Sequence, residues 1–188
     1  MAGAARKRRP AGPAPTIVLI GLRGSGKSTV GPIVAHRLGR QFIDLDSVTL
    51  WRLGAASVDQ AWRERGVAAF RATEAMALAE ALEQPARVIA SGGGTPTAPG
   101  SADLLRDRGR RGLAFIVYLR ETPGVLRTRL GGADENRPSL TGRGVIDEID
   151  EVFAARDPLY RSLASLVIEK SASPEDAAER ITIAACGE

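Results

Sequence analysis

Residues 21–29 read GLRGSGKST, and this segment constrains the fold more than any other part of the chain. It follows the apolar run TIVLI and precedes a stretch in which apolar residues recur at the spacing of one helix face, up to Gly39. The pattern G-x-x-x-x-G-K-[ST] between a strand and a helix lets backbone N–H groups converge on phosphate oxygens at a helix N-terminus. A chance glycine-rich turn is the alternative, but the full pattern in this context favours a phosphate-binding loop.

Two side chains of this loop add chemistry to it. Lys27 brings a positive charge to a phosphoryl group in transit, and the Ser28 hydroxyl can ligate Mg²⁺. The loop therefore predicts binding of Mg-ATP, with ATP as a substrate. It does not separate kinases from ATPases, GTPases or motors, because all of these use the same cradle.

Short β-branched runs alternate with helical stretches from Thr16 onward, which is typical of a parallel sheet covered by helices. Helices are expected at residues 57–84, broken near Gly66, at 122–130, and from Ser173, where Pro174 and Asp176 complete a capping pattern. We predict strands at residues 16–20, 42–45, 87–90, 114–119 and 166–169. These elements predict an α/β fold with a five-stranded parallel sheet.

The length of 188 residues fits one globular domain, which we place at residues 16–188. Residues 1–15 are rich in Pro, Ala and Gly and contain no acid, so we expect a disordered basic tail there. Residues 131–144, GGADENRPSLTGRG, are polar and irregular. Their length and Arg137 favour a mobile lid over an ordinary surface loop.

The formal net charge of +4 comes from the tail alone, because the other 22 basic residues equal the 22 acidic ones. A balanced body argues against a nucleic-acid-binding face, and a basic arm or targeting segment is the minority alternative for the tail. No apolar run reaches the roughly 20 residues that span a bilayer. Cys186 and His36 are single residues of their types, which disfavours a disulfide, a zinc site or a His-based triad. We expect a cytoplasmic protein without nucleic-acid or membrane partners.

The run Asp44-Leu45-Asp46 closes the second predicted strand. Side chains repeat every second residue along a strand, so both carboxylates are expected on one side, facing the phosphates at the carboxyl edge of the sheet. Asp44 can hold Mg²⁺ through water, and Asp46 can orient or deprotonate an acceptor hydroxyl. Solvated acids at a strand end are the commoner origin of such a pair.

Three arginines are candidates for binding an anionic ligand. Arg71 and Glu74 stand three residues apart, so they form either an ordinary intrahelical ion pair or a presented Arg71 that Glu74 holds for a substrate carboxylate. Arg137 lies in the presumed lid, and Arg156 precedes the last predicted strand. A single surface arginine usually only solubilises, so these residues gain meaning in combination.

A glycine run follows the third predicted strand. Ser91 is followed by Gly92, Gly93 and Gly94, and three glycines in succession allow the backbone to approach a ligand closely. A tight turn alone needs only one or two of them. The run therefore adds to the candidate acceptor site.

The segments GLRGSGKST, DLD, FRATE, SGGG, NRP and RDPLY, in this order and at these separations, resemble the shikimate kinase family. The resemblance runs from about Thr16 to the C-terminus. It implies a P-loop NTPase with the three-layer fold of nucleoside monophosphate kinases. It also implies ATP-dependent phosphorylation of the 3-hydroxyl of shikimate, giving shikimate 3-phosphate and ADP with Mg²⁺ as the cofactor, and we expect a monomer.

The resemblance also implies roles for particular residues. Lys27, Asp46 and Arg137 form the implied catalytic set, while Ser28 and Asp44 serve Mg²⁺. The residues implied to bind ATP are Gly24, Ser25, Gly26, Lys27, Ser28, Thr29, Arg137, which reaches the phosphates, and Arg129, which covers adenine near residues 172–174. The residues implied to bind shikimate are Asp46, Arg71, Gly92, Gly93, Gly94 and Arg156.

Two alternatives remain open. Another small-molecule P-loop kinase, such as a gluconate or nucleotide kinase, would keep the loop and the lid but change DLD, FRATE and SGGG. A shikimate-kinase-like ligand-sensing module would bind a metabolite without catalysis. Such a module can dispense with Asp46 or the Mg²⁺ ligands and would carry an N-terminal helix-turn-helix, for which 15 residues are too few.

Overall fold

The structure is a computed structural model that describes residues 14–131 and 146–186. At its centre lies one sheet of five parallel strands in the order β2-β3-β1-β4-β5. The strands are β1 Thr16–Ile20, β2 Phe42–Asp44, β3 Val88–Ala90, β4 Ala114–Arg120 and β5 Leu166–Glu169. All five predicted strands are confirmed, and their ends differ from the prediction by no more than one residue.

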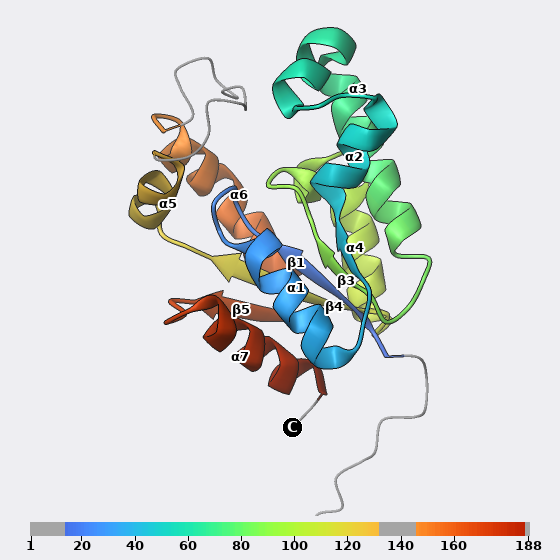
Figure 1. Ribbon diagram of the computed structural model, residues 1–188, viewed down its shortest axis with the longest axis vertical. Coiled ribbons are helices and arrows are strands. Elements are labelled where there is room, and N and C mark those ends of the chain that lie inside the picture. The colour runs from blue at the N-terminus through green and yellow to red at the C-terminus, as the bar shows by residue number, and fades with distance from the viewer. Residues whose placement is uncertain (1–13, 132–145, 187–188) are drawn as a thin grey trace, which may run out of the picture.

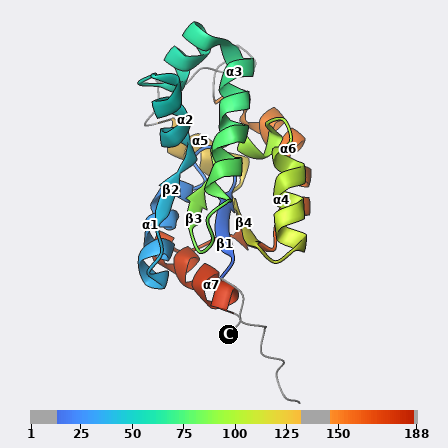
Figure 2. The same cartoon turned by 90° about the vertical axis from the view of Figure 1, so that its right-hand side faces the viewer.

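Helices bury both faces of the sheet, because the strands carry apolar side chains at successive positions. On one face, Ile17 and Leu19 of β1 pack in a cluster with residues of α1 (Lys27–Leu38) and α7 (Pro174–Cys186). On the other, Val18 and Ile20 pack with residues of α3 (Val58–Ala81), α4 (Ser101–Arg110) and α6 (Ile149–Leu163). Figures 1 and 2 show the resulting three layers, as predicted.

The predicted helices are confirmed as α1, α3, α5 (Pro123–Leu130) and α7. Gly39 is the C-cap of α1, and the Ser173 Oγ accepts a hydrogen bond of 3.2 Å from the Asp176 N–H at the start of α7. Three helices were not predicted, namely α2 (Leu45–Leu53), α4 and α6. Within residues 14–131 and 146–186, no helix is both long and apolar enough to cross a bilayer.

The placement of Asp46 on a strand is wrong. The strand β2 ends at Asp44, and α2 begins at Leu45, so Asp46 lies in the first turn of a helix. Asp44 is the N-cap of that helix, because its Oδ1 accepts a hydrogen bond of 3.1 Å from the Ser47 N–H. An aspartate that satisfies an orphan N–H at a helix start is a favourable capping residue, and this preference overrides continuation of the strand.

The α2–α3 segment rises beyond the carboxyl edge of the sheet, opposite α5 (Figure 1). Arg52 of α2 ties it to α3 through a 2.9 Å hydrogen bond from Nη1 to Glu80 Oε1. The predicted break in α3 is confirmed at Gly66, whose φ of 81° and ψ of 156° are non-helical. The break separates Trp62 from Phe70 and Arg71, which all line one pocket described below.

Candidate active site

The phosphate loop connects β1 to α1. Gly26 is the N-cap of α1 and has a φ of 92°, in the left-handed region that glycine adopts without strain. The first turn of α1 contains no acidic residue of its own, so its positive dipole end is available to an anion. The predicted strand–loop–helix arrangement of the motif is therefore confirmed.

Lys27 closes this loop on itself. Its Nζ donates hydrogen bonds to Gly21 O and Leu22 O, each of 2.9 Å, and to Ser25 Oγ at 3.3 Å. The side chain is only 7% exposed. The ammonium charge is thus held inside the loop rather than in open solvent.

Ser28 and Asp44 come together at the mouth of the loop. The Ser28 Oγ donates a 2.8 Å hydrogen bond to Asp44 Oδ2. A hydroxyl and a carboxylate are the hard oxygen ligands that Mg²⁺ prefers. No group of three or more His, Cys, Asp or Glu side chains able to hold a metal occurs in the described ranges. This pair therefore fits an ion that takes its other ligands from phosphates and water.

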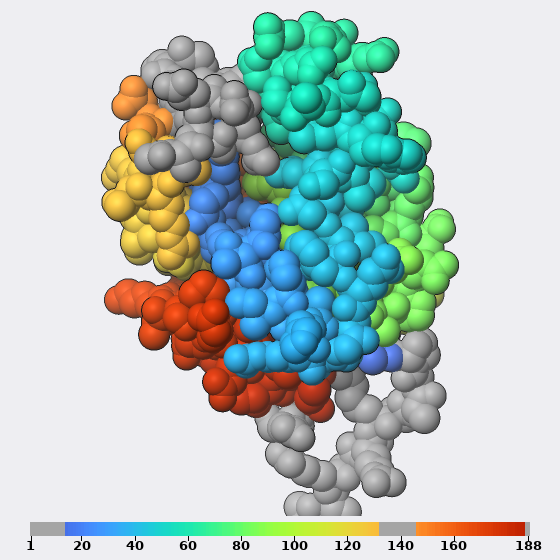
Figure 3. All heavy atoms as spheres, viewed as in Figure 1, coloured from blue at the N-terminus to red at the C-terminus, as the bar shows by residue number. Residues whose placement is uncertain are grey.

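A cleft of about 550 Å³ extends from the phosphate loop to residues 171–174 at the start of α7. Arg129 of α5 lines it, with Nη1 donating to Gly24 O at 3.0 Å and Nη2 paired with Glu121 Oε1 at 3.1 Å. The face in Figure 3 is hollowed between α5, in yellow, and the α2–α3 segment, in cyan. This cleft contains the predicted loop residues, Arg129 and the segment expected near adenine.

A smaller pocket of about 100 Å³ adjoins this cleft, and Arg71 on α3 forms one of its walls. Arg71 Nη1 pairs with Glu74 Oε2 at 2.5 Å, and Thr95 Oγ1 donates to Glu74 Oε1 at 3.0 Å. The Arg71 guanidinium lies 5.9 Å from the ring centroids of both Trp62 and Phe70. The predicted pair is therefore present, with Glu74 buried and Arg71 half-buried.

Glu74 is the most buried acid of this pocket, with 1% exposure. Burial raises the pKa of its carboxyl group above the ordinary value, whereas the charge and hydrogen bond of Arg71 and the hydroxyl of Thr95 act in the opposite direction. The direction shows that Arg71 offsets only part of the desolvation penalty. The ion pair of Glu74 with Arg71 therefore positions the guanidinium, and the desolvation of the Glu74 carboxylate lowers the free energy of unfolding.

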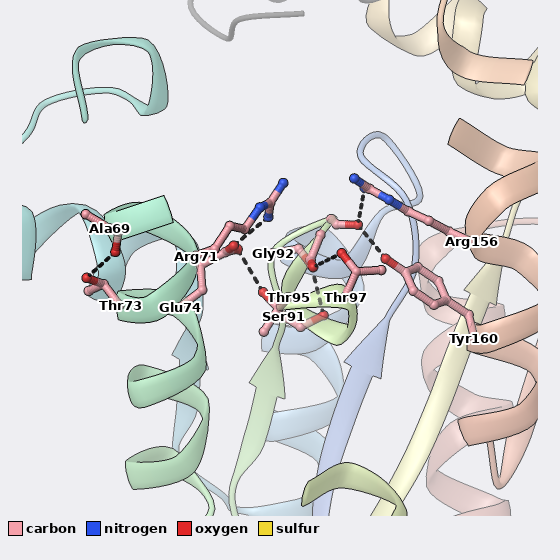
Figure 4. A network of polar contacts seen from close by, with 12 residues as sticks. Ala69, Arg71, Thr73, Glu74, Ser91, Gly92, Thr95, Thr97, Arg156 and Tyr160 are labelled. Atoms are coloured by element: carbon pink, nitrogen blue, oxygen red, sulfur yellow. Dashed lines mark hydrogen bonds and ion pairs between the residues drawn. The ribbon is translucent and has the colours of Figure 1, made fainter. Parts of the chain in front are cut away.

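The opposite wall comes from α6. Arg156 Nη1 donates a 2.9 Å hydrogen bond to Gly93 O, and Tyr160 Oη donates one of 2.7 Å to the same oxygen. Burial raises the pKa of Tyr160 to about 12, so its hydroxyl remains a donor at neutral pH. Figure 4 shows Arg71 and Arg156 on opposite sides of the glycine turn, with both guanidinium groups directed to the same side of it.

The glycine turn after β3 is packed too tightly for larger residues. A Cβ at Gly92 would lie 2.4 Å from Asp46 Oδ1 and 2.6 Å from Glu74 Oε1. A Cβ at Gly94 would lie 2.2 Å from Arg71 Nη1. The sequence predicted close approach of the backbone to a ligand; the structure shows that the turn makes room for the side chains of Asp46, Glu74 and Arg71.

The cleft and the pocket share four lining residues, namely Arg23, Asp46, Gly93 and Leu130. The pocket and the cleft therefore adjoin each other beside Asp46. Asp46, which lies on a helix and not on a strand, lines both the cleft at the phosphate loop and the pocket between Arg71 and Arg156.

A polar cluster behind the pocket fixes α6 against the sheet. The Asp157 carboxylate accepts hydrogen bonds from Tyr118 Oη at 2.9 Å, Arg120 Nε at 2.7 Å and Arg161 Nε at 3.0 Å. Burial alone would raise the pKa of Asp157, but the donors from Arg120, Tyr118 and Arg161 outweigh it and lower the pKa. Asp157 directly follows Arg156, so the cluster also fixes the helix that carries Arg156.

The structure brings together every predicted site residue that it describes. Arg137, residues 132–144 of the predicted lid and residues 1–13 of the predicted tail lie outside the described residues. Sequence reasoning missed Trp62, Tyr160 and Arg23. Tyr160 follows Arg156 by four positions and shares its helix face, but Pro158 between them obscured the helix.

Comparisons with known proteins agree with this geometry. The family model described as shikimate kinase matches residues 23–185. Shikimate kinase 2 of Yersinia enterocolitica is 36% identical over 168 residues, which cover 88% of this chain and 92% of that protein. A shikimate kinase from Acinetobacter baumannii, solved in complex with shikimate, is 32% identical with a TM-score of 0.82 and covers 92% of this chain and 93% of that one.

A gluconokinase from Sinorhizobium meliloti shares the fold, with 19% identity, a TM-score of 0.52 and coverage of 93% of this chain and 92% of that one. At this identity the likeness concerns the fold alone. The family model and the relatives above 30% identity decide between these families, and the chain belongs to the shikimate kinase family.

Proposed function

We propose that this chain transfers the γ-phosphoryl group of ATP to the 3-hydroxyl of shikimate, giving shikimate 3-phosphate and ADP. The observation that carries the proposal is Asp46, a carboxylate shared by the phosphate cleft and the arginine-walled pocket. A phosphotransferase needs its acceptor hydroxyl beside a proton acceptor and in line with the donor phosphate. The junction of the two volumes supports this assignment.

The smaller pocket is assigned to shikimate. Arg71 and Arg156 on opposite walls suit a compact acceptor that carries a carboxylate and hydroxyl groups. A guanidinium has five N–H donors, enough for Arg71 to bind both Glu74 and a substrate carboxylate. Gly93, whose carbonyl Arg156 and Tyr160 hold, places backbone at the pocket floor.

The larger cleft is assigned to ATP, with residues 24–29 at the phosphates and Arg129 with residues 171–174 at the base. Ser28 and Asp44 would hold Mg²⁺, since their oxygens fit the ion's preference and lie within 2.8 Å of each other. When bound, Mg²⁺ would neutralise charge on the phosphates.

In this mechanism the acceptor oxygen forms a bond to the γ-phosphorus while its proton passes to the Asp46 carboxylate. The bond from the γ-phosphorus to the bridging oxygen breaks, and its electron pair leaves with ADP. Lys27, fixed in the loop by Gly21 and Leu22, supplies positive charge on the donor side. Positioning and charge neutralisation account for such a transfer, so no nucleophilic side chain is needed.

The test is a coupled ADP-release assay with shikimate, gluconate, nucleoside monophosphates and no acceptor. We expect ADP release when shikimate is the acceptor and not with the other acceptors or without an acceptor. Turnover confined to gluconate or a nucleotide would refute the acceptor assignment. Binding of shikimate without ADP release would favour a ligand-sensing module instead.

We further propose that the enzyme acts as a monomer in the cytoplasm without a nucleic-acid partner. Analytical ultracentrifugation across a concentration series tests the first point, since a dimer would raise the sedimentation coefficient with concentration. Cell fractionation tests the second. A mobility-shift assay at physiological salt tests the third.

A further inference from the structure

Arg23 lies where two volumes meet, namely the larger cleft, which is assigned to ATP and called the ATP cleft below, and the smaller pocket, which is assigned to shikimate and called the acceptor pocket below. Arg23 is the third residue of the loop, at a position where the phosphate-binding pattern sets no requirement. It lines both volumes, as do Asp46, Gly93 and Leu130 among the described residues. Its Nε and Nη2 atoms are shielded from solvent, although the residue as a whole is only half-buried.

The backbone at Arg23 is fixed against the acceptor side. A Cβ at Gly93 would lie 3.0 Å from Arg23 N and 3.5 Å from its Cα. The carbonyl of Gly93 is in turn held by Arg156 and Tyr160. The loop and the acceptor pocket are therefore in contact at this point, and the packing of Gly93 against Arg23 constrains the position of the Arg23 backbone.

The charges at the junction explain why a cation is useful there. Asp46 and Arg23 are the charged residues among the four that line both volumes. A phosphoryl group that moves past the Asp46 carboxylate is repelled by it, and a neighbouring guanidinium offsets that repulsion. The ammonium of Lys27 is bonded to Gly21 O and Leu22 O within the loop, on the donor side. A planar guanidinium also matches phosphate oxygens in pairs.

We propose that Arg23 is a catalytic residue that binds the phosphoryl group in transit and then the 3-phosphate of the product. This inference rests on the proposed function. In the step, the acceptor oxygen bonds to the γ-phosphorus, its proton passes to Asp46, and the electron pair of the broken phosphorus–oxygen bond leaves with ADP. Arg23 keeps its proton throughout and contributes only positive charge and hydrogen bonds.

The experiment compares the wild type with Arg23→Met, which keeps most of the side-chain length and removes the charge. We expect kcat to fall about 10- to 100-fold, with the KM for shikimate and for ATP changed less than about threefold. In equilibrium binding, the affinity for shikimate 3-phosphate should fall about tenfold or more, while the affinity for shikimate changes less than about threefold. Retention of part of the product affinity in Arg23→Lys would show that charge matters.

The matched control is Arg129→Met, another arginine of the same cleft. It should raise the KM for ATP and leave the affinity for shikimate 3-phosphate unchanged. Circular dichroism and thermal melting check that each variant folds, and Arg23→Gln replaces Arg23→Met if the latter does not.

Two failures are distinguishable. A wild-type protein that does not phosphorylate shikimate refutes the proposed function itself. The role of Arg23 is overturned if the wild type is active and a folded, uncharged Arg23 variant keeps kcat and product affinity within twofold of the wild-type values. The proposed function would then still stand.

Discussion

The phosphate loop and the acceptor pocket adjoin each other but are built in opposite ways. The loop is one contiguous segment, residues 21–29, that uses its own backbone groups and a helix N-terminus. The pocket takes side chains from α2, α3 and α6, and Asp46 and Arg156 in it are 110 positions apart in the chain. Local sequence is sufficient for the first, whereas the second exists only once the sheet has assembled.

The two regions also differ in how they carry charge. The hydrogen bonds of Lys27 to two backbone carbonyls and a hydroxyl keep its charge within the loop. In the pocket, the half-buried Arg71 pairs with the buried Glu74, and loss of Arg71 leaves the buried charge of Glu74 uncompensated. Substitution of Arg71 in the acceptor pocket should therefore affect stability and shikimate binding together. Substitution of Asp46, where the pocket meets the cleft, should affect turnover.

The largest effect is expected at the junction, from Asp46→Asn. The variant keeps the shape of the side chain but loses the proton acceptor, so kcat should fall about 10²- to 10⁴-fold. ATP affinity measured by calorimetry should stay within about threefold, because the cleft is otherwise unchanged. Asp59→Asn, at a half-buried aspartate paired with Arg63, is the matched control and should keep the wild-type rate. A kcat within about tenfold of the wild type would remove Asp46 from the mechanism.

Arg71→Met should affect both binding and stability. Loss of charged hydrogen bonds worth about 1.5–3 kcal/mol predicts a KM for shikimate raised about 10- to 100-fold. The free energy of unfolding should fall by about 3 kcal/mol at neutral pH, because Glu74 is left buried without its partner. The double variant Arg71→Met/Glu74→Gln should recover most of the stability and none of the affinity. Recovery of both would show that Arg71 does not touch the ligand.

The same variant has a pH signature. Because burial raises the pKa of Glu74 in the folded state, its contribution to stability is present below about 4.5 and is lost as pH rises through the folded pKa. Without Arg71 this loss should be larger. Urea titrations should therefore show a stability deficit of Arg71→Met that grows as pH rises from 4.5. A deficit independent of pH would assign it to packing alone.

Gly94→Ala tests the close packing of the turn against Arg71. Its new Cβ would lie 2.2 Å from Arg71 Nη1, so the guanidinium must shift. We expect the KM for shikimate to rise about tenfold, as for a loss of roughly 1.4 kcal/mol, with the KM for ATP unchanged. Gly124→Ala in α5, with nothing within 4 Å of its added Cβ, is the control and should be neutral or slightly stabilising. Equal effects of the two substitutions would contradict the packing argument.

The smallest effect is expected from Asp157→Asn, behind the pocket. The variant should lose about 1–2 kcal/mol of unfolding free energy at pH 7 and raise the KM for shikimate only a few-fold. Because the folded pKa of Asp157 is lowered, the wild-type advantage is present above about 3.8 and is lost as pH falls through the folded pKa. Denaturation curves from pH 7 down to pH 3 measure this convergence, and parallel curves would exclude an ionic role.

The phosphate loop and the parallel sheet were predictable because local patterns determine them. Strand runs, the glycine at the end of α1 and the break at Gly66 all have signals within a few residues. The helices α2 and α6 have no such clear local signal. Asp44 is compatible both with a strand end and with a helix N-cap, and Pro158 disfavours the helix that contains it. In α6 the packing of Tyr160 and the hydrogen bonds of Asp157 outweigh that preference.

The residues of the acceptor pocket were predictable from the sequence, but the way in which segments distant in the chain come together there was not. The arginines, the glycine run and Asp46 stood out by family resemblance, whereas the position of Arg23 at the junction depends on how the loop meets Gly93. Contacts between segments 70 or more residues apart leave no pattern in a single sequence, as with Arg23 and Gly93.

The central strand β1 has a consequence for synthesis of the protein. β1 leaves the ribosome first of the five strands, yet Ile17 pairs with Val88 on one side and Phe115 on the other. At about 5–20 residues per second, roughly 4–14 s pass before β3 exists to pair with it. During that time an apolar five-residue strand has no sheet to join, so the nascent chain depends on chaperones or on the helix α1 to shield it. Chains arrested before residue 88 should therefore be protease-sensitive, and those arrested well beyond β4 should resist cleavage.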